Sequence, residues 1–470
     1  MQQTNHTMPF ILGTALSLAI YYLYFGQAFF VDEGSYCTIA QGILRGQLPY
    51  RDYFNEKGPL HYFLTALVMK LSLPGVEGGR IASSLLLAAT FGLVLRTLQS
   101  AGIGMRPYLS WLAAIVLTGL GMSVFNNTAE STLAFSAAVS ATVLLKLEEH
   151  PRRQAWIIGL AQGLACGARQ TMLLPAFLLL FWPMWKTCRR DYLLALAVGI
   201  GLWVAPLLAT GTWNDYLYSC VFFHIGNPSF HNYLETPAKQ DVLVIAAWAI
   251  SFFFALMAAS RGNKHLLFIV WALALALPFF ARMDAFRLWP SFVALAIFLI
   301  TRIQVLRPGL GERRAWKLHG AAPVLFASLS AVGLIQQDRM HDYDSIHVIA
   351  NRVHTLVKPN ETIWAGPFSP GIYCLAERSS ASRFYFILPW LMKQEVQQEI
   401  MRDLGQQPPA LIVDDSGTDG VIEAMIPGFD GFLKQNYLLV QTIHGTRLYK
   451  RGAKIANPCS GAYAVLVKGR

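Results

Sequence analysis

The chain has 470 residues, of which 54% are hydrophobic and 14% are charged, whereas about 25% of the residues of an ordinary soluble protein are charged. This composition excludes an ordinary soluble globular protein and predicts a polytopic α-helical membrane protein. The formal net charge of +11 does not indicate nucleic-acid binding, because the excess of Lys and Arg lies in short loops of the apolar part. From Asp338 onward, 14 Lys and Arg stand against 13 Asp and Glu.

The first predicted element is an apolar segment, Met8 to Val31, that is long enough to span a bilayer. It has no basic n-region and no small-residue cleavage site, so we expect an uncleaved transmembrane helix near 9–30 rather than a signal peptide. Asp32 and Glu33 follow this segment directly and open a polar, aromatic loop, 31–78, which we expect on the outer side of the membrane.

Placing the basic loops inside predicts eleven transmembrane helices, a cytoplasmic N-terminus and an outer location for the chain after about residue 336. The predicted spans lie near 9–30, 79–98, 108–124, 128–146, 154–168, 171–186, 191–210, 240–259, 265–281, 286–302 and 319–335. Segment 60–73 is apolar but short for a span, and counting it would place the basic loops outside. We therefore predict an interfacial helix there, and a second one near 213–224 in the outer loop 211–239.

The residues after 336 have a different character. Strand-like runs at 361–366, 382–386, 410–415 and 437–449 alternate with turn signals and with an amphipathic stretch at 391–404. This pattern predicts a small α/β domain with its own core, which the topology places on the outer side of the membrane. We therefore divide the chain into a transmembrane domain, 1–335, and an outer domain, 336–470. Asp414-Asp415 ends one run without neighbours that complete a catalytic set, so we interpret it as a polar strand end.

The pair Asp32-Glu33 is the strongest candidate for chemistry. Carboxylates at a membrane face lose hydration that only specific partners replace, and partial burial raises the pKa of a carboxyl toward the range of a general base. The alternative is that Asp32 only caps a helix that begins near Gly34. A cap needs one acid, whereas the same loop offers further acids with basic partners, and this favours an active site.

The motifs of this loop resemble those of the GT-C membrane glycosyltransferases. The acidic pair is followed by Gly46-Gln47-Leu48-Pro49-Tyr50-Arg51-Asp52 and then by Lys57-Gly58-Pro59-Leu60. This order is similar to that of the protein O-mannosyltransferase and aminoarabinose-transferase-like group and of the RgtA/B/C/D-like bacterial enzymes. The resemblance covers about residues 8–335 and, more loosely, the tail. Gly58 stands where the family commonly has a second proline.

The resemblance implies a GT-C fold and an inverting transfer of a sugar from a polyprenyl-phosphate donor, with Asp32 as the catalytic base. Glu33 and Glu130 are further candidate catalytic carboxylates, although Glu130 also suits the start of a helix. The leaving polyprenyl phosphate needs cationic neutralisation rather than a general acid. The candidate cations on the outer side are Lys57, Arg169, Arg282 and Arg287, and interfacial snorkelling is an equal alternative for the last two.

Aromatic and polar side chains in the outer loops are candidates for contacts with the loop or the acceptor. They are Tyr36, Tyr50, Asp52, His224 and His231. Two histidines are a weak metal signal, and the six cysteines show no metal-ligand spacing. No cofactor is therefore certain, and a divalent cation stays open.

These features together predict a glycosyltransferase of the bacterial inner membrane with a periplasmic active site. Its donor is a polyprenyl-phosphate sugar, and its acceptor is a lipid, a glycan or a protein. Three alternatives remain: a transferase that uses a diphosphate-linked lipid and a divalent cation, a transporter or lipid flippase, and a non-catalytic scaffold. The sequence has no inverted repeat and no paired Gly/Pro-broken helices in matching halves, which argues against transport.

Overall fold

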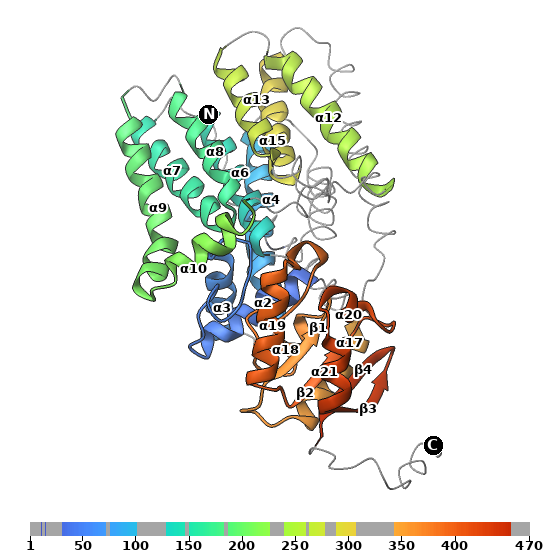
Figure 1. The fold of residues 1–470 in the computed structure, drawn as a ribbon. Coiled ribbons are helices and arrows are strands. Elements are labelled where there is room, and N and C mark those ends of the chain that lie inside the picture. Colours follow the sequence, from blue (N-terminus) through green and yellow to red (C-terminus); the bar gives the residue numbers. More distant parts are fainter. Residues whose placement is uncertain are drawn as a thin grey trace, which may run out of the picture. The chain divides into compact units, whose positions relative to one another are not determined.

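The structure is a computed structural model that describes residues 11, 15, 31–71, 76–100, 128–145, 150–182, 187–225, 239–259, 263–277, 288–306 and 343–452. The chain divides into two compact units, Met1–Ile346 and His347–Arg470. The described part of the first unit is helical, whereas the second unit combines a mixed β-sheet with helices (Figure 1).

The described part of the first unit is a set of packed helices (Figure 1). Its described helices are α2 (Val31–Leu44), α3 (Leu60–Leu71), α4 (Val76–Ser100), α6 (Thr128–Leu144), α7 (Pro151–Ala168), α8 (Leu173–Leu178), α9 (Arg189–Ala209), α10 (Trp213–Leu217), α12 (Lys239–Ala259), α13 (Asn263–Ala274) and α15 (Trp289–Leu306). A π-helical turn, Tyr218–Phe222, continues α10. The helix at 60–71 and the helical segment at 213–222 confirm that the segments predicted near 60–73 and 213–224 are helical, and their interfacial position stays a prediction.

Helices α7 and α9 approach each other closely because small residues line their contact. A Cβ on Gly163 would lie 2.6 Å from the Leu196 carbonyl oxygen, and one on Gly199 would lie 2.8 Å from the Leu160 carbonyl oxygen. Trp203 Nε1 donates a hydrogen bond of 3.1 Å to the Gly163 carbonyl oxygen. Such close approach replaces the hydrophobic driving force that helices lack in lipid with van der Waals packing and interhelical hydrogen bonds.

Buried polar side chains join α3, in the first loop, to α6, and join α6 to α7. The Thr65 and Thr128 hydroxyls lie 3.1 Å apart and link α3 to α6. Gln162 Nε2 on α7 donates to Ser140 Oγ on α6 at 2.9 Å. These hydrogen bonds specify how the helices around the loop face each other, because each broken one would leave a buried polar group unpaired.

The predicted spans agree with the described helices in position, whereas their number is not tested. The spans near 79–98, 128–146, 154–168, 171–186, 191–210, 240–259, 265–281 and 286–302 overlap described helices. Within the described part of the chain, α9 is the one helix long and apolar enough to cross a membrane. The predicted spans near 108–124 and 319–335, and that near 9–30 apart from positions 11 and 15, lie outside the described residues. The count of eleven stays a prediction.

The second unit has a four-stranded sheet in the order β1-β2-β4-β3. Its strands are β1 (Ile363–Gly366), β2 (Leu411–Asp414), β3 (Tyr437–Ile443) and β4 (Thr446–Arg451), and its helices are α17 (Tyr343–Leu356), α18 (Gly371–Leu375), α19 (Gln394–Gln406), α20 (Val421–Met425) and α21 (Phe429–Asn436). Strands β1 and β2 are parallel and fully buried, and β4 is antiparallel to both β2 and β3. This is the α/β character that the alternating runs predicted.

The strand predicted at 382–386 is wrong. This segment is irregular, and the position beside β1 is occupied by the preceding residues: Ile363 donates its backbone N–H to the Ser379 carbonyl, and Ala381 donates to the Ile363 carbonyl. The hydroxyl of Ser382 accepts a hydrogen bond from the backbone N–H of Phe384. Local side-chain bonds of this kind compete with a β-ladder. By contrast, the amphipathic stretch forms α19, and the run at 437–449 is a hairpin of β3 and β4.

A buried arginine organises one end of the second unit. Arg378, which is 3% exposed, donates five hydrogen bonds to the carbonyl oxygens of His354, Val357, Ala376 and Glu377. Two of these residues belong to the end of α17 and the turn that follows it. The guanidinium therefore satisfies carbonyl groups that a helix leaves unpaired at its C-terminal end.

Candidate active site

Asp32 and Glu33 lie in the first turn of α2, so Asp32 is not the N-cap of a helix that begins near Gly34. Consecutive residues on a helix point about 100° apart. The two carboxylates accordingly reach different partners. The Asp32 side chain is 30% exposed, whereas that of Glu33 is 3% exposed.

Glu33 is held in a buried ion pair with Arg80, near the start of α4. Arg80 Nε donates to Glu33 Oε1, and Arg80 Nη2 donates to Glu33 Oε2 at 3.0 Å. Both residues are at most 4% exposed. A bidentate guanidinium contact of this kind stabilises the ionised carboxylate and ties up both of its oxygens.

Asp32 pairs instead with Lys57, from the far end of the first loop. Lys57 Nζ donates to Asp32 Oδ2 at 2.6 Å and lies 5.0 Å from the centroid of the Tyr36 ring. Burial lowers the pKa of Lys57, and the charge of Arg169 lowers it further, while the Asp32 carboxylate opposes both effects. The site therefore contains a partly exposed carboxylate beside an ammonium group whose charge is costly to keep buried.

Gly58 brings this part of the loop against the C-terminal end of α7. A Cβ on Gly58 would lie 2.2 Å from the Gly167 carbonyl oxygen, and a Cβ on Gly167 would lie 2.4 Å from the Trp203 ring. No side chain fits at either position without moving backbone or a buried indole. This explains locally why glycine occupies position 58. It also brings Arg169, which directly follows α7 and is 7% exposed, near Lys57.

Three other predicted loop residues have defined positions. Tyr36 is 2% exposed and packs its ring edge-on against His61, with 4.3 Å between the ring centroids. Tyr50 is fully buried, and its hydroxyl donates to the Lys57 carbonyl oxygen at 2.7 Å. Asp52 accepts the backbone N–H of Leu48 at 2.7 Å, so it stabilises a turn of the loop.

His224 contacts the same loop from the segment after α10. Its Nε2 lies 3.7 Å from Glu56 Oε2, and Gln170 Nε2 donates to the Glu56 carbonyl oxygen at 3.1 Å. Within the described ranges, no group of three or more His, Cys, Asp or Glu side chains is arranged to hold a metal ion.

His61 was not predicted from the sequence, although it belongs to this cluster. The side chain is fully buried, and neither ring nitrogen has a hydrogen-bond partner in the part of the chain that the structure describes. Burial lowers its pKa well below 6.5, and the charge of Lys57 adds to this effect. His61 could have been found from its position, four residues after Lys57. The apolar character of segment 60–73 made it look like part of a membrane-facing helix instead.

Four predicted site residues cannot be placed with the others. Arg282, Arg287 and His231 lie outside the described residues, and for Glu130, in the first turn of α6, only the backbone is described.

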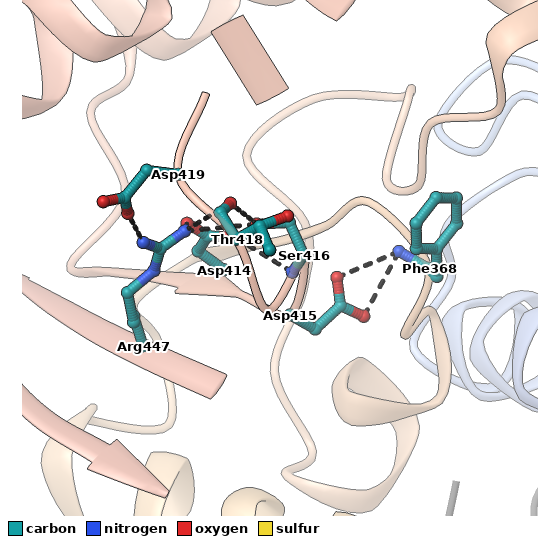
Figure 2. Close-up of polar contacts among 7 residues, drawn as sticks. All are labelled: Phe368, Asp414, Asp415, Ser416, Thr418, Asp419 and Arg447. Atoms are coloured by element: carbon teal, nitrogen blue, oxygen red, sulfur yellow. Dashed lines mark hydrogen bonds and ion pairs between the residues drawn. The ribbon is translucent and has the colours of Figure 1, made fainter. Parts of the chain in front are cut away.

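The second pair of adjacent acids, Asp414 and Asp415, is engaged in contacts within the second unit (Figure 2). Arg447 Nη2 donates to Asp414 Oδ2 at 2.6 Å, and Ser416 donates both its backbone N–H and its hydroxyl to Asp414 Oδ1. Asp415 accepts the backbone N–H of Phe368, at 3.1 and 3.2 Å to its two oxygens. These bonds join the ends of β1 and β2 to β4, so both acids have a role in stabilising the sheet.

No protein-family model and no curated protein matches the chain. Solved structures resemble it over nearly its whole length. ArnT from Cupriavidus metallidurans bound to undecaprenyl phosphate has a TM-score of 0.63 at 16% identity, and the match covers 95% of this chain and 99% of that one. The apo state of ArnT gives a TM-score of 0.57 at 15% identity, covering 95% and 98%.

An oligosaccharyltransferase from Archaeoglobus fulgidus, in complex with Zn and sulfate, has a TM-score of 0.50 at 13% identity, with 94% of this chain and 73% of that chain covered. The chain therefore has the GT-C fold that the resemblance of its first loop predicted.

Proposed function

We propose that this protein is a membrane glycosyltransferase that moves a sugar from a polyprenyl-phosphate donor to an acceptor hydroxyl. The observation that carries the proposal is the contact of 2.6 Å between Lys57 and Asp32, a cation and a partly exposed carboxylate at the start of a GT-C fold. The undecaprenyl phosphate bound to ArnT, a protein of the same fold, supports the donor class.

Asp32 is the general base in this mechanism. It accepts the proton of the acceptor hydroxyl while the hydroxyl oxygen attacks the anomeric carbon and the bond from that carbon to the phosphate oxygen breaks. The electron pair of the broken bond leaves on polyprenyl phosphate, which is a stable anion. A single displacement with the base opposite the leaving group inverts the anomeric centre.

Lys57 neutralises the leaving phosphate in the same step. A donor phosphate competes with Asp32 for the ammonium group, so donor binding weakens the ion pair and leaves the Asp32 carboxylate free to accept a proton. Arg169 adds positive charge at the same place, and Arg282 and Arg287 are further candidates for the phosphate. Glu33 has a positioning role, because its bidentate contact with Arg80 leaves it poorly suited to accept a proton.

We further propose eleven spans in a bacterial inner membrane, with the N-terminus in the cytoplasm and residues 336–470 in the periplasm. The acceptor class, whether lipid, glycan or protein, stays open. Glu130, Tyr36 and Asp52 remain candidates for acceptor contacts, as do His224 and His231. No specific observation favours transport.

Whether sugar transfer requires a divalent cation stays open. The Archaeoglobus oligosaccharyltransferase was determined with Zn. In the described part of this chain, Glu56 and His224 are two neighbouring candidate ligands, and no third carboxylate, imidazole or thiol completes a set with them. The proposed mechanism therefore uses no metal ion. Activity that is lost with a chelator and restored by Mg²⁺, Mn²⁺ or Zn²⁺ would require a cation in the mechanism.

The test is sugar transfer by purified protein with labelled polyprenyl-phosphate sugars, comparing wild type with Asp32→Asn. Asn keeps the shape of Asp and cannot accept the proton, so we expect turnover to fall by about 10²- to 10⁴-fold. Asp191→Asn, at the first turn of α9, is the matched control and should leave turnover unchanged. Full turnover by Asp32→Asn contradicts the assignment of the base, and no transfer by the wild type with any donor contradicts the proposed function.

A further inference from the structure

Tyr50 has a backbone conformation that tyrosine rarely adopts. Its φ is +69°, in the left-handed region, and its side chain is fully buried. A non-glycine residue in this region is strained and persists there only where the surroundings hold it. In the described part of the first unit, Tyr50 is the one non-glycine residue with a positive φ. This calls for a specific role of its side chain.

The side chain of Tyr50 holds the backbone of Lys57. Its hydroxyl donates to the Lys57 carbonyl oxygen at 2.7 Å, while its own N–H donates to the Tyr53 carbonyl at 2.9 Å. Burial, reinforced by nearby Cys220 and Tyr216, raises the pKa of Tyr50 well above 10, so the phenol remains a hydrogen-bond donor at all working pH values. The Sγ of Cys220 also lies 3.5 Å from the Lys57 carbonyl oxygen.

The other side of the Lys57 residue is held as well. Its backbone N–H donates to Asn55 Oδ1 at 3.2 Å, and Asn55 Nδ2 donates to Ser35 Oγ at 3.0 Å. Ser35 lies on α2, the helix that carries Asp32. Lys57 is thus held at its N–H by a link to α2 and at its carbonyl by Tyr50, while its ammonium group reaches Asp32.

We propose that Tyr50 is a positioning residue for Lys57. The hydroxyl of Tyr50 sets where the ammonium group of Lys57 lies between Asp32 and the leaving phosphate. This inference rests on the proposed function, and it gives Tyr50 a role that acts through Lys57 rather than on the acceptor. The strained backbone at Tyr50 is what directs the phenol toward the Lys57 carbonyl.

Tyr50→Phe tests the proposal because it removes the hydroxyl and keeps the ring. We expect kcat for sugar transfer to fall by about 10- to 100-fold, since small misplacement of a catalytic cation is costly. We also expect the acid limb of the pH–rate profile to move to higher pH, because a loosened ammonium group stabilises the ionised carboxylate of Asp32 less. A residue that only stabilises the loop would not move that limb.

Tyr53→Phe is the matched control. Tyr53 is buried in the same loop, and its hydroxyl donates to Gln47 Oε1 at 2.6 Å, away from Lys57. Its kcat and acid limb should match those of wild type. The double variant Tyr50→Phe/Lys57→Met should be no less active than Lys57→Met alone, because residues that act through one group are not additive. Wild-type kinetics in Tyr50→Phe, equal losses in Tyr53→Phe, or an additive double variant would each overturn the proposal.

A binding measurement separates this inference from the proposed function. Undecaprenyl phosphate, titrated against purified protein, should bind wild type and Tyr53→Phe equally and Tyr50→Phe about 3- to 10-fold more weakly, a small change of the kind that loss of one hydrogen bond causes. If the wild type binds and transfers, and Tyr50→Phe does both equally well, only the inference about Tyr50 is contradicted. If the wild type binds undecaprenyl phosphate but does not transfer sugar, the proposed function is wrong, and the binding comparison still tests the position of Lys57. If the wild type shows no binding and no transfer, both the inference and the proposed function are contradicted.

Discussion

Arg80 contacts both carboxylate oxygens of Glu33, and the two side chains lie buried between α2 and α4. The neighbouring acid, Asp32, contacts a different cation and is partly exposed. Two adjacent carboxylates that look equivalent in the sequence thus occupy unlike environments. A base must lose and regain a proton readily, and this favours the exposed member of the pair.

Removing Arg80 should destabilise the protein strongly. Arg80→Met leaves the Glu33 carboxylate buried without its bidentate partner, which costs about 3–5 kcal/mol, whereas Glu33→Gln/Arg80→Met removes both charges and should recover most of that loss. Thermal unfolding in detergent measures both. If the single variant unfolds at the wild-type temperature, the pair does not anchor α2.

Gly58→Ala should displace the segment that carries Lys57. The added Cβ would lie 2.2 Å from a backbone oxygen of Gly167, and neither backbone can move aside cheaply. We expect a lower unfolding temperature together with reduced sugar transfer. Gly201→Ala in α9 is the control, because a Cβ there meets nothing within 4 Å, and it should be neutral or stabilising by about 0.5–1 kcal/mol. Equal behaviour of the two variants would contradict the close contact.

His61 should make the protein less stable as the pH falls below about 6.5. Its pKa in the folded protein is lowered by burial and by Lys57, so in this range the unfolded chain takes up a proton that the folded chain does not. Stability then decreases with falling pH by up to about 1.4 kcal/mol per unit for this one group. Unfolding temperatures at pH 7.5 and 5.5 should differ less in His61→Phe than in wild type. His150→Gln, which changes an exposed histidine, should behave as wild type.

Arg378→Met should loosen the second unit without touching the first. It leaves buried carbonyl groups at the end of α17 without donors, and each such group costs about 1–3 kcal/mol. Limited proteolysis should cleave the second unit faster than in wild type, while Arg402→Met, at an exposed position of α19, should not change the rate. Equal cleavage of both variants would mean that these bonds contribute little.

Local sequence patterns predicted most of the helices and strands, but not which side chains contact each other across the fold. Apolar periodicity predicted the helices, and the loop motifs predicted the GT-C fold, because both depend on residues close in sequence. The contact between Asp32 and Lys57 joins residues 25 apart, and that between Glu33 and Arg80 joins residues 47 apart. The sequence identified three of these four side chains as candidates, and it could not distinguish the two acids without their cations.

The missed features have the same cause. His61 lies in an apolar helix, and only its packing against Tyr36 and Tyr62 brings it into the charged cluster. The run at 382–386 has the residue types of a strand, yet the place beside β1 is taken by neighbouring residues. The left-handed backbone of Tyr50 has no signal in a residue type that usually avoids it.

The order of strands in the second unit has a consequence for its biogenesis. β4, the last of the four described strands to be made, lies between β2 and β3. One side of β2 therefore has no partner until the ribosome has released the chain through Arg451. Until that moment the nascent domain presents an open strand edge, which invites wrong pairing. If this unit is periplasmic, as proposed, the chain must be exported through Arg451 before the sheet can close, so a stall in translocation before that residue would expose a half-built sheet to proteases.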